Sequence, residues 1–167
     1  MTINTDTVYF AKTNEYSIIP NKRDEDGCYD IYACIDTNII IMPHEVKLIP
    51  TGICSAFSSK YRLAIRERGS NTKSCLITMA GQVDSGYRGE IFVALYNGNE
   101  VPMVLTNSIL GIDKTISSEY IMMGTDKAIA QFAMEEVPNV IIEEISIDEL
   151  KSISSIRGEG CLGSSNK

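Results

Sequence analysis

Three side chains that could do chemistry lie together in one predicted turn: Asp84, Tyr87 and Arg88. Apolar, β-prone runs at Leu76–Val83 and Ile91–Tyr96 flank this turn, and the pattern predicts a β-hairpin with the three residues at its tip. The tip would present a carboxylate, a phenol and a guanidinium. A solvated hairpin without a function would also be polar, so the meaning of the tip depends on the rest of the chain.

Four further polar clusters are spread along the sequence. They are Asp30 on a β-prone segment, Arg66–Lys73, Gly124–Gln131, and a Gly/Ser-rich tail that starts at Arg157. Glycine lets backbone N–H groups approach phosphate oxygens, serine donates a hydroxyl, and arginine offers a planar fork of donors. None of the clusters has the GxxxxGK(S/T) spacing of a Walker A loop. Taken singly, a charged run is usually a solvated face and such a tail is usually a linker.

Length, composition and charge narrow the function classes. The chain has 167 residues and a hydrophobic fraction of 44%, which predicts one domain with a real core. Its net charge of −7 makes nucleic acid an unfavourable partner. A small polyphosphate remains possible, because it needs only a local group of positive charges and a divalent cation. No apolar run is long enough to span a bilayer and no signal segment begins at Met1, so we expect no membrane partner.

The cysteine and histidine content argues against zinc and against histidine-dependent nucleophilic catalysis. The five cysteines show no CxxC spacing, and the single histidine, His44, follows Pro43 in a predicted exposed turn. Free thiols are typical of a reducing compartment, so we expect a cytoplasmic protein.

Short β-prone runs separated by turn signals predict an all-β barrel or jelly roll. Helix is expected only over Ser146–Lys151, where Ser146 and Glu149 can form a capping box. Besides the two hairpin strands, the expected strands are Val8–Ala11, a strand within Asp26–Ala33, Ile39–Met42, Lys47–Phe57, Tyr61–Arg66, Val101–Leu105, Ala128–Val137 and Val140–Glu144.

Local features refine this pattern. Gly86 and Gly89 are expected to supply the positive φ angles of a tight hairpin. Pro50 and Gly52 predict an edge or a bulge in their strand. Residues Gly98–Gly124 lack strong patterning and are interpreted as a long connection between two strands. Within it, residues 98–123 are interpreted as an insertion.

In this order, the polar clusters resemble the five motifs of the homotrimeric dUTP diphosphatases, or dUTPases. The matching segments, which run from Asp26 to Ser165, read DGCYDIYA, RERGSNTK, AGQVDSGYRGEI, GTDKAIAQF and RGEGCLGSS. The resemblance implies a jelly-roll-like dUTPase fold (β-clip) in one domain over 1–167, and a homotrimer whose active sites each use more than one chain. It implies Mg²⁺-dependent hydrolysis of dUTP to dUMP and pyrophosphate, which keeps uracil out of DNA. If a phage encodes the chain, the expected location is the host cytoplasm.

The resemblance also implies roles for the hairpin. Asp84 would be the catalytic base, which orients and deprotonates the water that attacks the α-phosphorus. Tyr87 would pack against the deoxyribose and leave no room for a 2′-hydroxyl. Arg88 follows the motif, and a salt bridge is preferred over a ligand contact. The main chain of the hairpin would read uracil, near Gly81, Gln82, Val83 and Phe92.

The first, second and fourth motifs imply a phosphate site. Asp30, the second catalytic candidate, would hold either the second-motif arginine or a water molecule bound to Mg²⁺. The metal itself would be bound mainly by the substrate phosphates and by water. The register of the arginine is open, because the family reads Arg-Ser-Gly where this chain reads Arg-Gly-Ser. Arg66 lies two residues away, and Arg68 is preferred because Lys73 then falls near its expected place. The implied phosphate ligands are Arg68, Gly69, Ser70 and Gln131.

The fifth motif implies that a flexible tail, 157–167, closes over the substrate. Leu162 stands where an aromatic residue usually covers the uracil, and Cys161 stands where glycine is usual, so tail closure departs most from the family pattern. The implied tail ligands are Arg157, Leu162, Gly163, Ser164 and Ser165.

Two other interpretations remain open. One is a nucleotide-gated regulatory protein that binds a partner protein through the 98–123 insertion, because long loops are often functional and some phage-encoded members have insertions there. The other is a dCTP deaminase, which shares the fold, although the AGQVDSGYRGE hairpin and the Gly-rich tail disfavour it.

Overall fold

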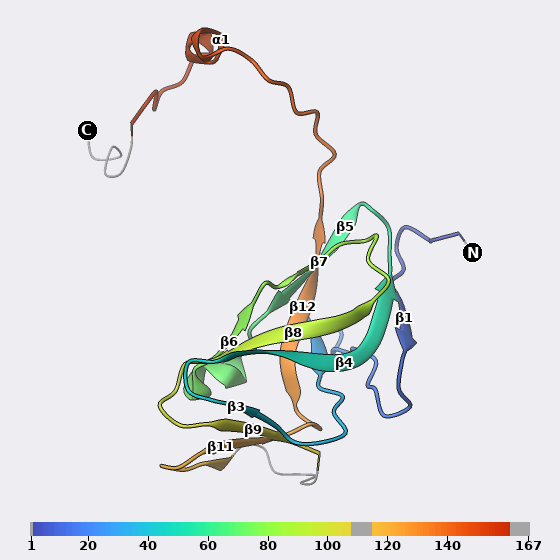
Figure 1. Ribbon diagram of the computed structural model, residues 1–167. Coiled ribbons are helices and arrows are strands. Elements are labelled where there is room, and N and C mark those ends of the chain that lie inside the picture. The colour runs from blue at the N-terminus through green and yellow to red at the C-terminus, as the bar shows by residue number, and fades with distance from the viewer. Residues whose placement is uncertain (1, 108–114, 161–167) are drawn as a thin grey trace.

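The computed structural model describes residues 2–107 and 115–160, and this part of the chain is almost entirely β-structure (Figure 1). The all-β prediction is therefore confirmed. Two short helices are present, a 3-10 helix η1 (Gly69–Ser74) and the α-helix α1 (Ile147–Ser152), and neither is long enough to cross a membrane. The strands are β1 (Tyr9–Lys12), β2 (Tyr29–Tyr32), β3 (Ile39–Ile41), β4 (Val46–Ala56), β5 (Tyr61–Arg66), β6 (Leu76–Met79), β7 (Gln82–Val83), β8 (Glu90–Asn97), β9 (Met103–Thr106), β10 (Thr115–Ile116), β11 (Ile121–Gly124) and β12 (Ala128–Glu136).

Three four-stranded sheets are formed by the described residues. Their strand orders are β1-β4-β8-β6, β10-β11-β9-β3 and β2-β12-β5-β7. All pairs are antiparallel except β9 with β11. In the third sheet, β12 lies between β2 and β5, so chain segments near residues 30, 66 and 131 become neighbours.

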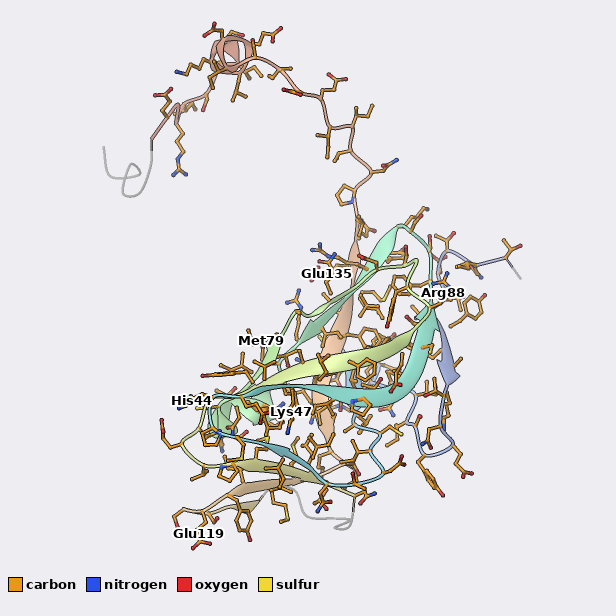
Figure 2. The ribbon with its side chains drawn as sticks, in the orientation of Figure 1. His44, Lys47, Met79, Arg88, Glu119 and Glu135 are labelled. Atoms are coloured by element: carbon orange, nitrogen blue, oxygen red, sulfur yellow. The ribbon has the colours of Figure 1, made fainter. Side chains whose placement is uncertain are left out.

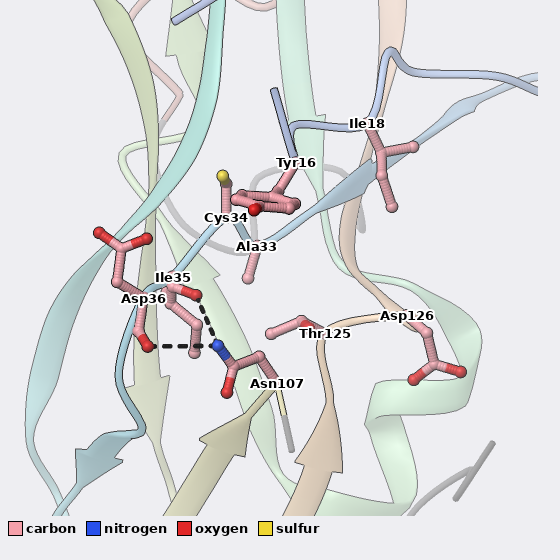
Figure 3. A pocket seen from close by; sticks show the side chains of 9 residues that line it. All are labelled: Tyr16, Ile18, Ala33, Cys34, Ile35, Asp36, Asn107, Thr125 and Asp126. Carbon is pink, nitrogen blue, oxygen red and sulfur yellow. Dashed lines mark hydrogen bonds between the residues drawn. The ribbon is translucent and has the colours of Figure 1, made fainter. Parts of the chain in front are cut away.

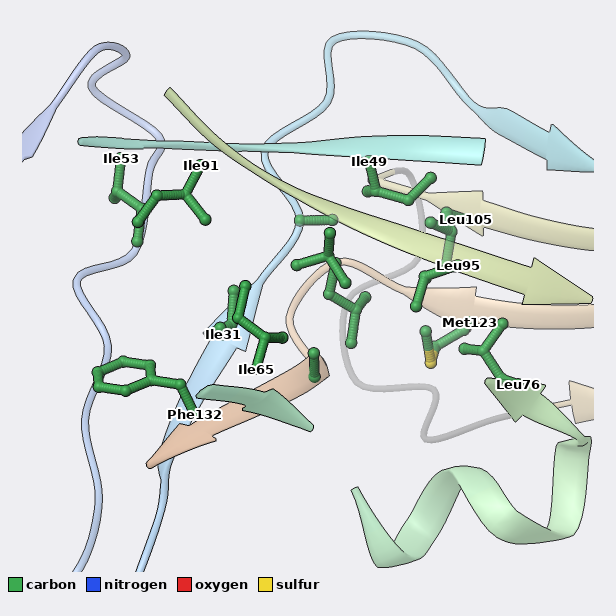
Figure 4. Packing of buried hydrophobic residues seen from close by; sticks show 14 of the residues in the cluster. Ile31, Ile49, Ile53, Ile65, Leu76, Ile91, Leu95, Leu105, Met123 and Phe132 are labelled. Atoms are coloured by element: carbon green, nitrogen blue, oxygen red, sulfur yellow. The ribbon is translucent and has the colours of Figure 1, made fainter. Parts of the chain in front are cut away.

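The core lies where the three sheets face one another (Figure 4). Ile49 and Leu95 come from the first sheet, Leu105 from the second, and Ile31 with Phe132 from the third, and all are at most 2% exposed. Burial of each such side chain contributes about 1.5–3 kcal/mol to the folded state. This shared core holds the sheets, and hence the polar segments on them, in place.

The predicted hairpin exists, but its first arm is divided between two sheets. β6 pairs with β8, with Met79 opposite Ala94. The chain then turns at Ala80, which has a positive φ of 50°, and β7 joins the third sheet with Val83 opposite Leu63 of β5. The hairpin tip is therefore anchored to two sheets.

The expectation for the hairpin glycines is wrong. In the described part of the chain, the glycines with positive φ are Gly52 (65°) and Gly158 (53°), and neither Gly86 nor Gly89 is among them. The bulge predicted near Pro50 is confirmed, because the register between β4 and β8 shifts there. β4 is a central strand of its sheet rather than an edge strand.

The proposed insertion is partly integral to the body. β9 and β11 lie within 98–123 or at its end, and Met103, Leu105, Ile121 and Met123 are at most 2% exposed. β9 also pairs with β3. The described strands within or at the end of 98–123 are therefore packed parts of the body, and the 98–123 insertion stays a prediction.

The C-terminal arm leaves the body after β12 (Figure 1). The helix prediction is confirmed: Ser146 is the N-cap of α1 and forms a capping box with Glu149. The strand predicted at Val140–Glu144 is wrong, and Ile141 and Ile142 are 88% and 92% exposed. A strand needs a neighbour for its backbone groups, and the described residues of this chain place none beside that segment.

Candidate active site

Three of the five sequence motifs meet in one cleft. In the third sheet, Gln131 of β12 lies opposite Asp30 of β2 on one side and opposite Arg66 of β5 on the other. The cleft has a volume of about 660 Å³. Its walls are Asp30, Arg68, Gln131 and the loop before β2, which contributes residues 21–23 and 26–28.

The central interaction of this cleft is a two-point ion pair between Arg68 and Asp30. Arg68 Nε lies 2.9 Å from Asp30 Oδ1, and Nη2 donates to Oδ2 at 3.0 Å. Both side chains are less than one-third exposed. Bidentate arginine–carboxylate pairs combine charge-assisted hydrogen bonds with a defined orientation. The geometry therefore favours Arg68 over Arg66 as the second-motif arginine.

Arg66 belongs to a different cluster, which is built around Glu135 (labelled in Figure 2). Its guanidinium pairs with Glu135, which also accepts a hydrogen bond from Arg62 Nε at 3.0 Å. The side-chain hydrogen bond from Arg66, followed by that from Arg62, lowers the pKa of Glu135 below its usual range. The cluster joins β5 to β12 and leaves Arg68 free to face the cleft.

Glu135→Gln is expected to lower the unfolding midpoint at pH 7. Because the folded-state pKa of Glu135 lies below its unfolded value, the charged form stabilises the fold above about pH 4.5. That contribution disappears as the pH falls through the folded-state pKa. Thermal unfolding of both forms from pH 7 to pH 3 should show a difference that shrinks in acid. Glu136→Gln, at an exposed neighbouring position, is the control, and an equal Glu135→Gln effect at pH 7 and pH 3 would contradict this assignment.

Asn71 is a positioning residue that sequence reasoning missed. It lies in η1, is 1% exposed, and its Nδ2 donates to the carbonyl of Ile129 in β12 at 2.8 Å. This bond fastens η1, whose first residues are the exposed Gly69 and Ser70, beside the cleft. No helical periodicity marks this segment, so only its cluster of polar residues gave a signal.

At the hairpin tip, Asp84 is exposed and Tyr87 is 46% exposed. The Tyr87 hydroxyl donates to the carbonyl of Glu90 at 2.9 Å, which fixes the ring against its own hairpin. A Cβ at Gly89 would lie 2.4 Å from that hydroxyl, so a larger residue at Gly89 would displace the Tyr87 ring from this position. Gln82 Nε2 lies 3.5 Å from Asp84 Oδ1. The tip thus presents a solvated carboxylate beside an aromatic ring held in one orientation.

Arg88 is a structural residue of the tip, at the position labelled in Figure 2. Its Nη1 donates to the carbonyls of Ser85 at 2.6 Å, Tyr87 at 2.9 Å and Ser55 at 3.4 Å. The expected salt bridge is absent from the described residues, because backbone carbonyls take the place of a carboxylate.

The segment expected to read uracil is held close to β5. The Gly81 carbonyl accepts a hydrogen bond from Ile65 N–H at 2.5 Å, and a Cβ at Gly81 would lie 2.2 Å from the Ile65 carbonyl oxygen. Only glycine permits this approach. Val83 is buried, whereas Phe92 is 44% exposed.

The hairpin tip and the cleft are far apart within one chain. Asp84 follows Val83, which lies opposite Leu63, so Asp84 is level with Arg62 and four positions from the Arg66–Gln131–Asp30 row. Four positions correspond to about 13 Å along the strand direction. The three strand spacings from β7 to β2 add about 14 Å at right angles, so Asp84 and Asp30 lie about 19 Å apart. One chain therefore does not bring Asp84 to the cleft lined by Asp30, Arg68 and Gln131.

The fifth motif is described only in part. Arg157 lies on the exposed C-terminal arm, where its Nε donates to the Gly160 carbonyl at 2.8 Å. The other predicted tail residues, Leu162, Gly163, Ser164 and Ser165, lie outside the described residues, as does Cys161.

A second cavity of about 510 Å³ contains none of the predicted site residues (Figure 3). At one side of it, Asn107 Nδ2 donates to the carbonyls of Ile35 and Asp36 at 3.2 Å each. Tyr16 and Asp126 also line it. These contacts fasten the end of β9 to the segment after β2.

Divalent metal would find no protein cage in the described part of the chain. No group of three or more histidine, cysteine, aspartate or glutamate residues is placed to hold an ion there. Both carboxylate oxygens of Asp30 bond to Arg68. Any divalent cation here would be held mainly by phosphate oxygens and water rather than by a set of protein ligands.

Known proteins resemble the chain at both the sequence and the structural level. The dUTPase family model matches residues 14–109. Deoxyuridine 5′-triphosphate nucleotidohydrolase of Wolbachia pipientis is 32% identical over 141 residues, 83% of this chain and 79% of that protein. The corresponding Clostridioides difficile protein is 30% identical, over 92% of this chain and 93% of its own length. The match to the Leptospira interrogans protein, at 33% identity over 84 residues, covers 58% of that relative.

Solved structures show the same fold. The dUTPase of Staphylococcus bacteriophage 80alpha with dUPNHPP superposes with a TM-score of 0.74 at 18% identity, over 96% of this chain and 98% of the other. The dUTPase of phage phi11 of Staphylococcus aureus gives a TM-score of 0.66 over 84% of this chain. With the family match covering more than half of the sequence, and with two relatives aligned over most of both chains, this chain belongs to the dUTPase family.

Proposed function

We propose that the protein hydrolyses dUTP to dUMP and pyrophosphate. The observation that supports this best is the cleft in which Asp30, Arg68 and Gln131 converge, together with a hairpin that presents Asp84 and Tyr87. The first set suits a polyphosphate, and the second suits a nucleoside and an attacking water. Both sets come from the segments that match the family's motifs.

In the proposed reaction, Asp84 accepts a proton from the water that attacks the α-phosphorus. The new P–O bond forms as the bond from the α-phosphorus to the bridging oxygen breaks, and pyrophosphate leaves. Asp84 suits this role because its carboxylate is exposed and, among the described residues, makes a long contact of 3.5 Å with Gln82 Nε2. Asp30, whose two carboxylate oxygens both bond to Arg68, is suited instead to anchoring that arginine.

The phosphate chain would lie in the cleft. Arg68 is oriented by Asp30, and Gln131 Nε2 is held by the Glu67 carbonyl at 2.8 Å, so both side chains have defined directions before substrate arrives. Preorganised donors lose little conformational entropy on binding. Mg²⁺ on the phosphates would offset their charge, with Asp30 contacting it through water.

Because Asp84 and the cleft lie about 19 Å apart within one chain, a site that uses both must take its hairpin and its cleft from different copies of the chain. We propose that these copies form the homotrimer of the family. Two observations support contact between copies. The outer face of β4, β6 and β8 is apolar, with Val46, Leu48, Ile77, Met79 and Phe92 each 44–65% exposed. The arm after β12 carries further exposed apolar side chains, including Ile141 and Ile142. Surfaces of this kind mark contact sites.

The test of the proposed function is a product assay with dUTP, UTP, dTTP, dCTP and dATP, with and without Mg²⁺. The expected result is pyrophosphate release from dUTP alone, and loss of that activity when EDTA removes the metal. Ammonia release from dCTP would establish the deaminase instead. Absence of pyrophosphate release from dUTP would refute the proposal.

Tyr87→Ala is expected to let UTP compete with dUTP. The Tyr87 ring is held over the hairpin by its bond to Glu90, so its removal opens space for a 2′-hydroxyl. The ratio of kcat/KM for dUTP over UTP should fall at least about tenfold. Tyr16→Ala, at a position 76% exposed and distant in sequence, is the matched control. An unchanged ratio in Tyr87→Ala would refute the gating role.

A second candidate function, regulation through a partner protein, rests on the segment between β9 and β11. Among the described residues, β10 pairs with β11 at the outer edge of the second sheet, whereas the cleft is carried by strands of the third sheet. A partner bound there would leave hydrolysis intact. A variant shortened between β9 and β11 that keeps dUTP hydrolysis would fit this candidate, whereas loss of assembly would indicate a structural role.

A further inference from the structure

Lys22 lies in the phosphate cleft but outside all five motifs. The loop that carries it folds back on β2, because Asp30 N–H donates to the Asn21 carbonyl at 2.8 Å. Lys22 therefore sits one residue from a direct backbone contact with Asp30, and both line the same cleft.

The ammonium group of Lys22 is held in position by groups without negative charge. Its Nζ donates to the carbonyls of Arg23 at 3.1 Å and Asp24 at 3.2 Å, and lies 5.4 Å from the centre of the Tyr29 ring. Carbonyl oxygens and an aromatic face orient a cation without neutralising it. Among residues 2–107 and 115–160, no carboxylate forms a salt bridge with Lys22.

The other charges of the cleft are matched in pairs. Arg68 pairs with Asp30. Arg23 pairs with Asp26 through Nε at 2.8 Å and Nη2 at 3.0 Å. The Arg23 hydrogen bond is the main cause of the lowered pKa of Asp26, and Lys22 contributes least. Among the described residues that line the cleft, Lys22 is thus the cation that no carboxylate neutralises.

We infer that Lys22 is an additional ligand for the polyphosphate chain of the substrate. A protein with a net charge of −7 repels a polyanion at long range, so each unmatched cation in the cleft matters for binding. A Lys22 hydrogen bond to phosphate is charge-assisted and replaces water on an ammonium that is already oriented. The assignment to a nucleotide substrate rests on the proposed function, whereas the assignment to a polyphosphate does not.

The direct test is calorimetric titration of inorganic tripolyphosphate into the full-length protein, with the same Mg²⁺ concentration in every sample. Lys22→Met should weaken binding at least about tenfold, which is the lower range for loss of a charge-assisted hydrogen bond. Lys22→Arg keeps the charge and should retain most of the affinity. Lys60→Met removes an exposed lysine from the turn between β4 and β5 and is the matched control. Matching thermal unfolding of the variants would show that they are folded.

Steady-state kinetics separate this inference from the proposed function. If dUTP is hydrolysed, Lys22→Met should raise KM at least about tenfold with a much smaller change in kcat. If dUTP is not hydrolysed but tripolyphosphate binding still depends on Lys22, the polyphosphate site stands and the activity proposal fails. Equal behaviour of Lys22→Met and Lys60→Met in both assays, or no tripolyphosphate binding by the wild type, would overturn the inference.

Discussion

Replacing Asp84 with asparagine is expected to lower the turnover of dUTP about a thousandfold, within the range for loss of general-base catalysis. The change keeps the shape of the side chain and removes the proton acceptor. Asp84 is exposed and its described contact is with Gln82 at 3.5 Å, so folding should be unaffected. Single-turnover hydrolysis and binding of a non-hydrolysable dUTP analogue would measure the two properties separately.

The control for this variant is Glu119→Gln, which converts an exposed carboxylate on the segment before β11 into an amide. It should hydrolyse dUTP at the wild-type rate. Normal pyrophosphate release by Asp84→Asn would exclude Asp84 as the base. Loss of analogue binding together with turnover would instead assign Asp84 to substrate binding.

Arg68→Ala is expected to lower kcat/KM for dUTP at least about a hundredfold. In the proposed site it removes two or more charge-assisted contacts between the guanidinium and the substrate phosphates, worth about 1.5–3 kcal/mol each. It also leaves Asp30, which is 28% exposed, without the partner that now bonds both of its oxygens. The variant should therefore unfold at a lower temperature as well. Arg68→Lys restores the charge but not the two-point geometry, so it should recover stability better than activity.

Arg66→Ala is the matched control, and it decides the register of the second motif. Arg66 lies two residues from Arg68 and pairs with Glu135, away from Asp30. Its removal should lower stability and leave kcat/KM for dUTP nearly unchanged. The reverse result, with Arg66 needed for activity and Arg68 dispensable, would show that the second-motif arginine has been misassigned.

Local sequence patterns predicted the fold class and most strands. β5 coincides with the predicted Tyr61–Arg66, and α1 with its Ser146 capping box lies within one residue of the expected helix. These features depend on side-chain alternation and on hydrogen bonds between near neighbours. Such interactions can be read from a short window of residues.

Other features could not be predicted because they depend on distant parts of the chain. Val140–Glu144 has the composition of a strand, yet the described residues offer it no neighbour. Gly89 leaves room for the Tyr87 ring against it, a role that no turn rule includes. The choice between Arg66 and Arg68 required the position of Asp30, which is set by the β2-β12-β5 strand order.

The motif order also gave no information about which copy supplies each residue. The segments of the second and third motifs are close in sequence, and β5 and β7 are paired, yet Asp84 and the Asp30–Arg68 pair lie about 19 Å apart by strand geometry. The strand register together with the β2-β12-β5-β7 order shows this separation. It makes the contribution of two chains to each site a requirement of the account rather than an addition to it.

Mixing two inactive variants tests that requirement most directly. Asp84→Asn retains an intact cleft and Arg68→Ala retains an intact hairpin, so a mixed assembly contains sites with both intact parts. After equal amounts are unfolded together and refolded, the account predicts activity of about one-quarter of wild type per chain, as random pairing of hairpin and cleft in a symmetric oligomer requires. A mixture no more active than its two separate components would contradict it.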